Sequence, residues 1–411
     1  MFGAILAIIV AALVYFTQPV NETLPQVTVT IMGITIITVA TLFLFLPVLI
    51  NALAWSPLQK AEQNLTPRIS TLFRKDRSLR IASAFLLFFS LISYLIAFDI
   101  LFFNFLNKNI ASPVWIVLLG VALDALHLSL SKISKCLDPF YVVDMYGHEA
   151  QLCIQNGEEL DLCYWIDALS EIAIRAMQRN SMSLCNHSVD ALQRTARIFM
   201  ECSKSIAHAE PDGQAKAMGI GDAVSYMLFF LLQRLEMIND KGIEQRLEPV
   251  CSSIITAIGK IVIASAKCDI SLPTYPLQFL GRFAVNAQRK GLLEVGPKAT
   301  CTLIEVAKSI LTDIDITYAE LQPPYFSLIA QLEAIAKEMF ARDKTINIKL
   351  LMQPFEDLKT LFSTEKMAAH QDTPAILNDI NRVLAEFSAL DDVMRAMPPM
   401  PAIPQEANIV A

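Results

Sequence analysis

Charge is scarce in this sequence, and it is unevenly distributed. Asp, Glu, Lys and Arg make up 18% of the 411 residues, whereas soluble globular domains contain about 25%. Residues 1–132 hold eight Lys or Arg and five Asp or Glu, and residues 133–411 hold 25 Lys or Arg and 35 Asp or Glu. The second part is acidic and has no basic stripe, which argues against nucleic acid as a partner, because phosphate binding requires clustered Lys and Arg.

Cysteine is absent from the first 135 residues and never occurs as a CxxC pair. No His lies at metal-ligand spacing from a Cys, so we expect neither a metal site nor a disulfide framework. Scattered thiols within apolar helical patterns are typical of a reducing cytosol. The cysteines are Cys136, Cys153, Cys163, Cys185, Cys202, Cys251, Cys268 and Cys301.

Recognisable catalytic motifs are also missing. The chain has no GxxxxGKS/T loop, no GxGxxG after a strand, no HExxH and no GxSxG. These motifs position phosphates, dinucleotides, a catalytic zinc ion and a nucleophilic serine. A catalytic site can assemble from distant positions, so the absence is weak evidence against an enzyme. We expect no cofactor, assign no catalytic residue, and treat an enzyme as the less favoured class.

Long hydrophobic runs dominate the first part of the chain. A helix that spans a bilayer needs about 20 mainly apolar residues, and four segments reach or approach this length. The first segment lacks the basic start and the small-residue cleavage site of a signal peptide. Residues 1–132 are therefore predicted to form a transmembrane domain of about four helices, at 2–16, 27–55, 81–105 and 110–131.

Basic residues in the connecting loops predict the orientation of these helices. Loop 17–26 has no Lys or Arg and loop 106–109 has Lys108 alone, whereas loop 56–80 has six. Since cytoplasmic loops carry the excess of Lys and Arg, we expect the N-terminus, loop 56–80 and the C-terminal domain on the cytoplasmic side of a cell inner membrane. We expect the basic loop to lie against anionic lipid headgroups. Its basic residues are Lys60, Arg68, Arg74, Lys75, Arg77 and Arg80.

Three ionisable side chains fall inside the predicted spans. Asp99 lies near the outer end of the third span, and Asp124 and His127 are three residues apart in the fourth, so they share a helical face. Such residues are costly in lipid and commonly face a bundle interior or a water-filled path. They predict either a proton or ion path or interhelical hydrogen bonds. At about 1.5 Å per residue, Asp99 and Asp124 are offset by about two helical turns, which weakens the ion-path hypothesis.

The second part of the chain is predicted to be helical after a short junction. Residues 133–159 contain an aromatic and β-branched run at 140–143, followed by Gly147 and Gly157, which favours a small β-hairpin. From 160 to 397 the apolar residues recur with the period of amphipathic helices, with a glycine break at 213–221. Residues 398–411 contain four prolines and are predicted to be a disordered tail. The expected helices are 160–179, 186–206, 222–238, 250–267, 276–290, 298–313, 323–341, 346–362 and 374–397.

Successive helices of this length, joined by short loops, fit two architectures. One is an α-solenoid of HEAT or armadillo type, and the other is an irregular compact bundle. In the helix at 346–362, one face is predicted to hold Leu350, Leu351, Phe355, Leu358 and Leu361.

Two functions are compatible with this organisation. The first is a membrane-anchored scaffold or adaptor that presents a helical protein-binding domain at the cytoplasmic face. The alternative is an ion or proton channel or transporter component that uses Asp99, Asp124 and His127, with the helical domain as regulator. The expected partners are membrane lipids and a protein on the cytoplasmic side, with a second copy of the chain as a further candidate.

Overall fold

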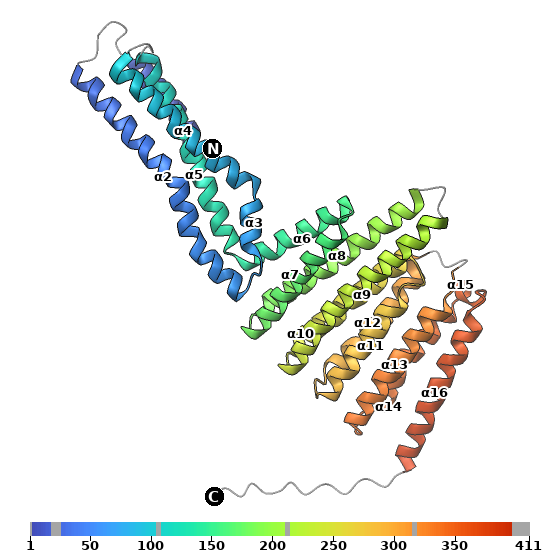
Figure 1. The fold of residues 1–411 in the computed structure, drawn as a ribbon. Coiled ribbons are helices and arrows are strands. Elements are labelled where there is room, and N and C mark those ends of the chain that lie inside the picture. The colour runs from blue at the N-terminus through green and yellow to red at the C-terminus, as the bar shows by residue number, and fades with distance from the viewer. Residues whose placement is uncertain (1, 18–25, 104–107, 210–213, 315–318, 397–411) are drawn as a thin grey trace, which may run out of the picture. The chain divides into compact units, whose positions relative to one another are not determined.

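The computed structural model of the chain describes residues 2–17, 26–103, 108–209, 214–314 and 319–396. Within these ranges every regular element is a helix, so the predicted all-α class is confirmed. The chain divides into two compact units, residues 1–145 and 146–411 (Figure 1). The tail predicted at 398–411 lies outside the described residues.

The N-terminal unit contains the hydrophobic segments as helices. The second of them, α2, continues beyond its predicted end at residue 55 and has Pro47 and Pro57 inside it. A short helix, α3, lies in the basic loop, where none was predicted, and a π-helix, η1, extends α4. The elements are α1 (Phe2–Thr17), α2 (Gln26–Asn64), α3 (Ile69–Lys75), α4 (Arg77–Phe98), η1 (Asp99–Phe103) and α5 (Lys108–Cys136).

Four described helices are long and apolar enough to cross a membrane, judged by length and composition alone. Three belong to the N-terminal unit, at Val29–Asn64, Arg77–Phe103 and Ile110–Cys136, and the fourth is Glu248–Cys268. The apolar part of α1, Gly3–Ala12, is shorter. In the fourth helix, 67% of the most apolar stretch is buried by other helices, compared with 22–33% in the other three. We therefore assign Glu248–Cys268 to the core of the C-terminal unit.

Polar side chains join the helices of the N-terminal unit inside an apolar core. The Ser90 hydroxyl of α4 donates to the Ala40 carbonyl of α2 at 2.7 Å, and the indole N–H of Trp115 in α5 donates to the Ser93 hydroxyl of α4 at 3.0 Å. Ser90 and Ser93 are fully buried. A buried hydroxyl without a partner would cost a few kcal/mol, so these bonds fix which faces of α2, α4 and α5 meet.

The β-hairpin predicted within 133–159 is wrong, because residues Pro139–Asn156 form helix α6. The Asp138 carboxylate accepts the N–H of Phe140 at 3.0 Å, so Asp138 caps the helix and Pro139 takes its first position. The β-branched pair of the supposed strand also begins a pattern with helical spacing, in which the ring of Tyr146 packs 5.2 Å from that of Trp165 in the next helix, α7 (Glu159–Gln178). The pattern comprises Val142, Val143, Tyr146, Ala150 and Cys153.

The helices of the C-terminal unit pack in two rows (Figure 1). One row contains α7, α9, α11 and α13, and the other contains α8, α10, α12, α14 and α16. Each helix contacts the next helix of its own row and the helix that follows it in the chain, apart from the four-residue α15. The elements are α7 (Glu159–Gln178), α8 (Met182–Ala209), α9 (Gln214–Glu244), α10 (Glu248–Cys268), α11 (Thr274–Arg289), α12 (Val295–Asp313), α13 (Gln322–Arg342), α14 (Ile348–Phe362), α15 (Glu365–Ala368) and α16 (Thr373–Ala396).

These helices lie close to the ranges expected from the sequence, with one clear exception. The predicted glycine break at 213–221 is shorter than expected, because α9 begins at Gln214 and includes Gly219 and Gly221. A glycine inside a helix costs only about 1 kcal/mol relative to alanine. The long apolar stretch that follows in α9 outweighs that cost when it is buried between α7 and α11.

Ion pairs connect successive helices of the first row. Asp167 of α7 pairs with Arg234 of α9 at 2.6 Å, and Glu236 of α9 pairs with Arg282 of α11 at 2.7 Å. Arg289 of α11 continues the series to Glu338 of α13 at 3.0 Å. Pairs of this partly exposed kind are each worth less than about 1 kcal/mol, so their main effect is to fix the register between neighbouring helices.

A further group of ion pairs joins α13 to α16, and its central carboxylate, Glu333, is largely shielded from solvent. Glu333 accepts from Arg382 at 2.9 Å and also pairs with Lys337, which contacts Glu386 at 3.1 Å. Burial raises the pKa of Glu333, but the bonds from Lys337 and Arg382 outweigh it and hold the pKa below its usual value of 4.5. The ionised form is therefore stabilised by folding.

We predict that acid weakens the C-terminal unit through Glu333. A carboxylate with a depressed pKa contributes stability above its unfolded pKa and loses it as the pH falls through the folded pKa. Glu333→Gln should lower stability at pH 7 by about 1 kcal/mol and flatten its decline below pH 4.5. Thermal unfolding of the full-length protein in detergent between pH 3 and pH 7 measures both effects, with the exposed Glu356→Gln as control. An unchanged acid slope in Glu333→Gln would contradict the assignment.

Candidate functional site

Asp124, predicted as part of an ion path or an interhelical contact, caps a neighbouring helix. Its Oδ1 accepts the N–H of Gly3 and its Oδ2 accepts the N–H of Ala4, each at 3.0 Å. The first N–H groups of a helix have no partner within the helix, and the helix dipole favours negative charge there. Asp124 therefore connects α5 to the first turn of α1.

Small residues let α1 and α5 approach closely beside this cap. A Cβ added at Gly120 would lie 2.3 Å from the Cβ of Ala7 and 2.6 Å from the carbonyl oxygen of Gly3. Gly3 of α1 lies beside Asp124 of α5, and Ala7 lies beside Gly120. The residue numbers rise along one helix as they fall along the other, so the two helices are antiparallel. Close backbone approach at glycine and alanine is a common way to pack apolar helices.

The structure does not bring Asp99 and Asp124 together. The Asp76–Lys132 ion pair at 3.5 Å and the Ser93–Trp115 hydrogen bond fix the register of α4 against α5. With about 1.5 Å per residue, either contact places Asp99 about 22 Å from Asp124 along the helix axes. The sequence predicted an offset of about two helical turns, and the offset in the structure is about twice as large. The reason is that η1 extends α4 beyond the level at which α5 begins. Asp99 is half-buried, and His127 is exposed.

The basic loop is folded onto the ends of α2 and α4. Leu58, Ile69 and Leu72 are buried, so α3 packs its apolar face on α2. Arg68 precedes α3 with a φ of 68°, and its N–H donates to the Glu62 side chain at 3.1 Å.

The six basic residues of the loop have different surroundings. The guanidinium of Arg74 lies 4.9 Å from the centre of the Trp55 ring. Arg68 is half-buried, and the side chain of Lys75 lies outside the described part of the structure. The exposed members are Lys60, Arg74, Arg77 and Arg80.

A cavity of about 560 Å³ opens between α2, α3 and α4 at this basic end. Two of its lining residues, Arg74 and Arg80, are cationic, and others are polar or apolar. The two arginines were predicted from the sequence as part of the basic loop, but the rest of the lining was not. The apolar residues inside the basic loop, Ile69, Leu72 and Phe73, were the signal that this loop contains a packed helix.

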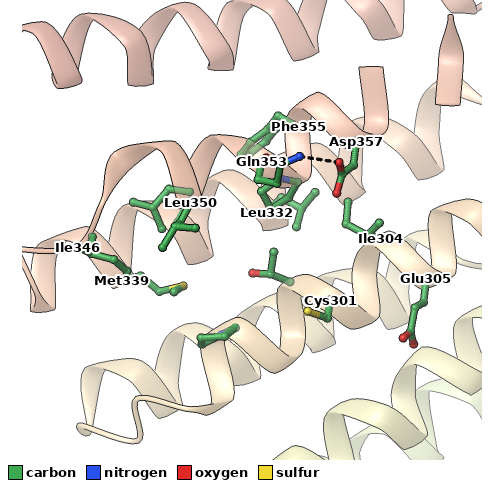
Figure 2. Close-up of a pocket in the computed structure, with 15 residues that line it drawn as sticks. Cys301, Ile304, Glu305, Leu332, Met339, Ile346, Leu350, Gln353, Phe355 and Asp357 are labelled. Carbon is green, nitrogen blue, oxygen red and sulfur yellow. Dashed lines mark hydrogen bonds between the residues drawn. The ribbon is translucent and has the colours of Figure 1, made fainter. Parts of the chain in front are cut away.

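The C-terminal unit carries a second cavity, of about 530 Å³, on α12, α13 and α14 (Figure 2). We call it the α12–α14 groove. Its walls are mainly apolar, with Ile304, Leu332 and Met339 among them, while Glu305 and Asp357 give it an acidic edge. The Asp357 carboxylate accepts the side-chain N–H of Gln353 at 2.9 Å. Such a groove can hold apolar side chains of a peptide or helix.

One leucine of α14 lines the groove from outside the core face of this helix. The buried face of α14 consists of Ile348, Leu351, Phe355, Leu358 and Phe362. Leu350, predicted on this face, is 67% exposed and lines the groove instead. Leu350 and Leu351 are adjacent and so lie about 100° apart around the helix, and a single apolar stripe cannot contain both.

Thiols and metal ligands offer little reactive chemistry in the described residues. Burial raises the pKa of the Cys185 and Cys251 thiols to about 12 each, so both are unreactive as nucleophiles. Cys301 is exposed and lines the α12–α14 groove. Across the described ranges, no three His, Cys, Asp or Glu side chains are grouped so that they could hold a metal ion.

Comparisons with known proteins add little to this description. No protein-family model matches the chain, and no curated protein matches it. Among solved structures, the chain is similar to a circular tandem repeat protein with novel repeat topology and enhanced subunit contact surfaces. The identity is 14%, the TM-score is 0.21, and the match covers 89% of this chain and 98% of that one. A TM-score this low supports no conclusion about function.

We predict that Asp124 stabilises the α1–α5 pair. Replacing a capping carboxylate by alanine costs about 1 kcal/mol, so Asp124→Ala should lower the thermal midpoint of the full-length protein in detergent by about 2–4 °C. Asp124→Asn keeps a carbonyl acceptor and should lose less. His127→Ala changes an exposed residue of the same helix and is the matched control. An Asp124→Ala midpoint equal to that of the wild type would refute the capping role.

Proposed function

We propose that the protein is a membrane-anchored scaffold, held in a cell inner membrane by α1, α2, α4 and α5. The outward faces of these helices support the proposal, because they are rich in large apolar side chains. Leu53, Phe45 and Leu95 are each more than 60% exposed, and a continuous exposed apolar surface is unfavourable in water but suits lipid. Four crossings would return the chain to its starting side, so the basic loop and the C-terminal unit would share the side of the N-terminus, which we propose is cytoplasmic.

The scaffold role follows from the two-row array of α7–α16. Rows of this kind have the packing of an α-solenoid, whose elongated surface commonly binds proteins. The observation that carries the proposal is the α12–α14 groove, with its apolar walls and the exposed Leu350. Its acidic edge of Glu305 and Asp357 favours a partner segment that combines apolar side chains with a basic group.

The polar residues of the apolar helices give less support to an ion path. The role of Asp124 as the cap of α1 accounts for a carboxylate in that position. The offset of about 22 Å from Asp99, estimated from the helix rise, leaves a gap that direct proton transfer does not bridge. We therefore favour the scaffold function over that of a channel or transporter component.

The orientation can be tested with the native thiol of Cys301. A membrane-impermeant maleimide should label the wild type in inside-out vesicles and leave it unlabelled in spheroplasts, because the C-terminal unit is proposed to be cytoplasmic. Cys301→Ser should lose most of the label, since the other cysteines are buried or half-buried. Strong labelling in spheroplasts would show that the proposed orientation is wrong.

The groove can be tested by crosslinking in native membranes. A photoreactive amino acid in place of Leu350 should give one defined adduct on irradiation, and its mass separates a second copy of the chain from another protein. The matched control is the same replacement at Val393, which is 51% exposed on α16 and lies outside the groove.

The partner complex should also depend on Leu350 itself. A charge at the centre of an apolar contact commonly costs 2 kcal/mol or more, so Leu350→Glu should weaken the complex at least about 30-fold, as measured by co-purification, while Val393→Glu leaves it intact. If the two glutamate variants behave alike, or if no adduct forms at 350, the groove is not the binding surface.

A further inference from the structure

We propose that the cavity between α2, α3 and α4 binds the phosphate headgroup of an anionic phospholipid. The inference rests on the membrane insertion proposed above, and it extends it from a basic loop near lipid to a defined site. The cavity is lined by Arg74 of α3, Arg80 of α4 and Trp55 of α2, which come from three different elements. Because these side chains are held by three packed helices, their hydrogen-bond donors are more precisely positioned than those of a flexible basic loop.

The local charge is positive and is not cancelled by the nearby acids. Loop 56–80 holds six Lys or Arg against Glu62 and Asp76. The Asp76 carboxylate caps α4 through the N–H of Ser78 at 2.8 Å and pairs with Lys132 of α5 at 3.5 Å. The Glu62 side chain accepts the N–H of Arg68 at 3.1 Å. Six positive charges against two negative ones give residues 56–80 a net charge of +4, which attracts an anionic headgroup.

The ring of Trp55 positions the guanidinium of Arg74. Their separation of 4.9 Å is that of a cation–π contact. This contact occupies the face of the planar guanidinium and leaves its N–H edge available to an anion. An arginine edge matches two phosphate oxygens at once, and tryptophan is enriched at the headgroup level of membranes.

Along α4 the lining of the cavity changes from charged to polar to apolar, which is also the order from the headgroup to the acyl chains of a phospholipid. Arg80, Ser83, Ala84 and Leu87 share one face of the helix and line the cavity, and they cover about 10 Å of its length. The charged end lies at the basic loop, the hydroxyl of Ser83 follows, and the apolar end points into the proposed span. Beyond the cavity this face continues with Leu91, which is 60% exposed.

This gradient favours a lipid over free phosphate. Inorganic phosphate would use the arginines but would leave the apolar end of the cavity without a ligand. An acyl chain that follows Leu87 and Leu91 removes that apolar surface from water. Asn51 of α2 and Ser83 of α4 add donors at the level of the ester groups. The paired arginines also disfavour a headgroup that carries its own cation, so phosphatidylglycerol should bind better than phosphatidylcholine.

The test uses the full-length protein in detergent, with phosphatidylglycerol or phosphatidylcholine added at equal concentration and bound lipid counted by native mass spectrometry. Arg74→Gln with Arg80→Gln should weaken phosphatidylglycerol binding about 100-fold, taking about tenfold for each lost hydrogen bond to the charged phosphate. Lys60→Gln with Arg77→Gln removes the same charge from the same loop outside the cavity, and it should change binding less than threefold. Equal losses in the two double variants would overturn the site in favour of a diffuse basic surface.

Two further arms separate the lipid from its alternatives. Inorganic phosphate at 10 mM should leave phosphatidylglycerol bound, and displacement would show that the site takes free phosphate instead. Phosphatidylglycerol should raise the thermal midpoint of the wild type and of the Lys60/Arg77 variant but not of the Arg74/Arg80 variant, each compared with its own lipid-free sample. A folding defect cancels in that comparison. Since lipid binding in detergent needs neither the partner nor a fixed orientation, its failure is distinguishable from failure of the scaffold proposal.

Discussion

Burial of helix faces between near neighbours is the constraint on which the C-terminal unit depends. No single helix there hides its apolar stripe alone, and α10 shows the extreme, with Ile254, Ile258 and Ile261 fully buried by α8, α11 and α12. Close approach within the rows is possible because glycines lie at two crossings. A Cβ at Gly259 of α10 would meet Thr302 of α12 at 2.4 Å, and one at Gly281 of α11 would meet Gln331 of α13 at 2.1 Å. An alanine at either position would therefore force the facing Thr302 or Gln331 side chain to move.

The two units differ in where their apolar surface lies. The C-terminal unit buries it, and ion pairs such as Asp167–Arg234 cover the outside of a row. The N-terminal unit leaves most of it on the outside and buries hydroxyls, with Ser90 and Ser93 fully enclosed. An aqueous protein with that inverted arrangement would associate through its surface. This contrast is the physical basis for proposing that lipid surrounds the N-terminal unit.

Local patterns in the sequence predicted much of the fold, and long-range partners account for what they missed. The helices between α7 and α16 follow from apolar spacing, which depends on residues three and four apart. The junction was mistaken for a hairpin because the run at 140–143 resembles a strand, although Asp138-Pro139 is a helix start. The cap of α1 by Asp124 joins residues more than 100 positions apart, and no local pattern contains it. Among the candidate sites, the arginines were visible as a basic cluster, whereas the α12–α14 groove depends on which leucine α14 leaves outside its core.

The last helix has a consequence for how the array can assemble. α16 contacts both α13 and α14, and most of its exposed residues are polar, among them Asn378, Asn381, Ser388 and Asp392. In a stacked array the terminal element needs a polar outer face, because an apolar one would recruit a further repeat. The polar exposed residues of α16 therefore oppose the stacking of a further helix against this side of the rows.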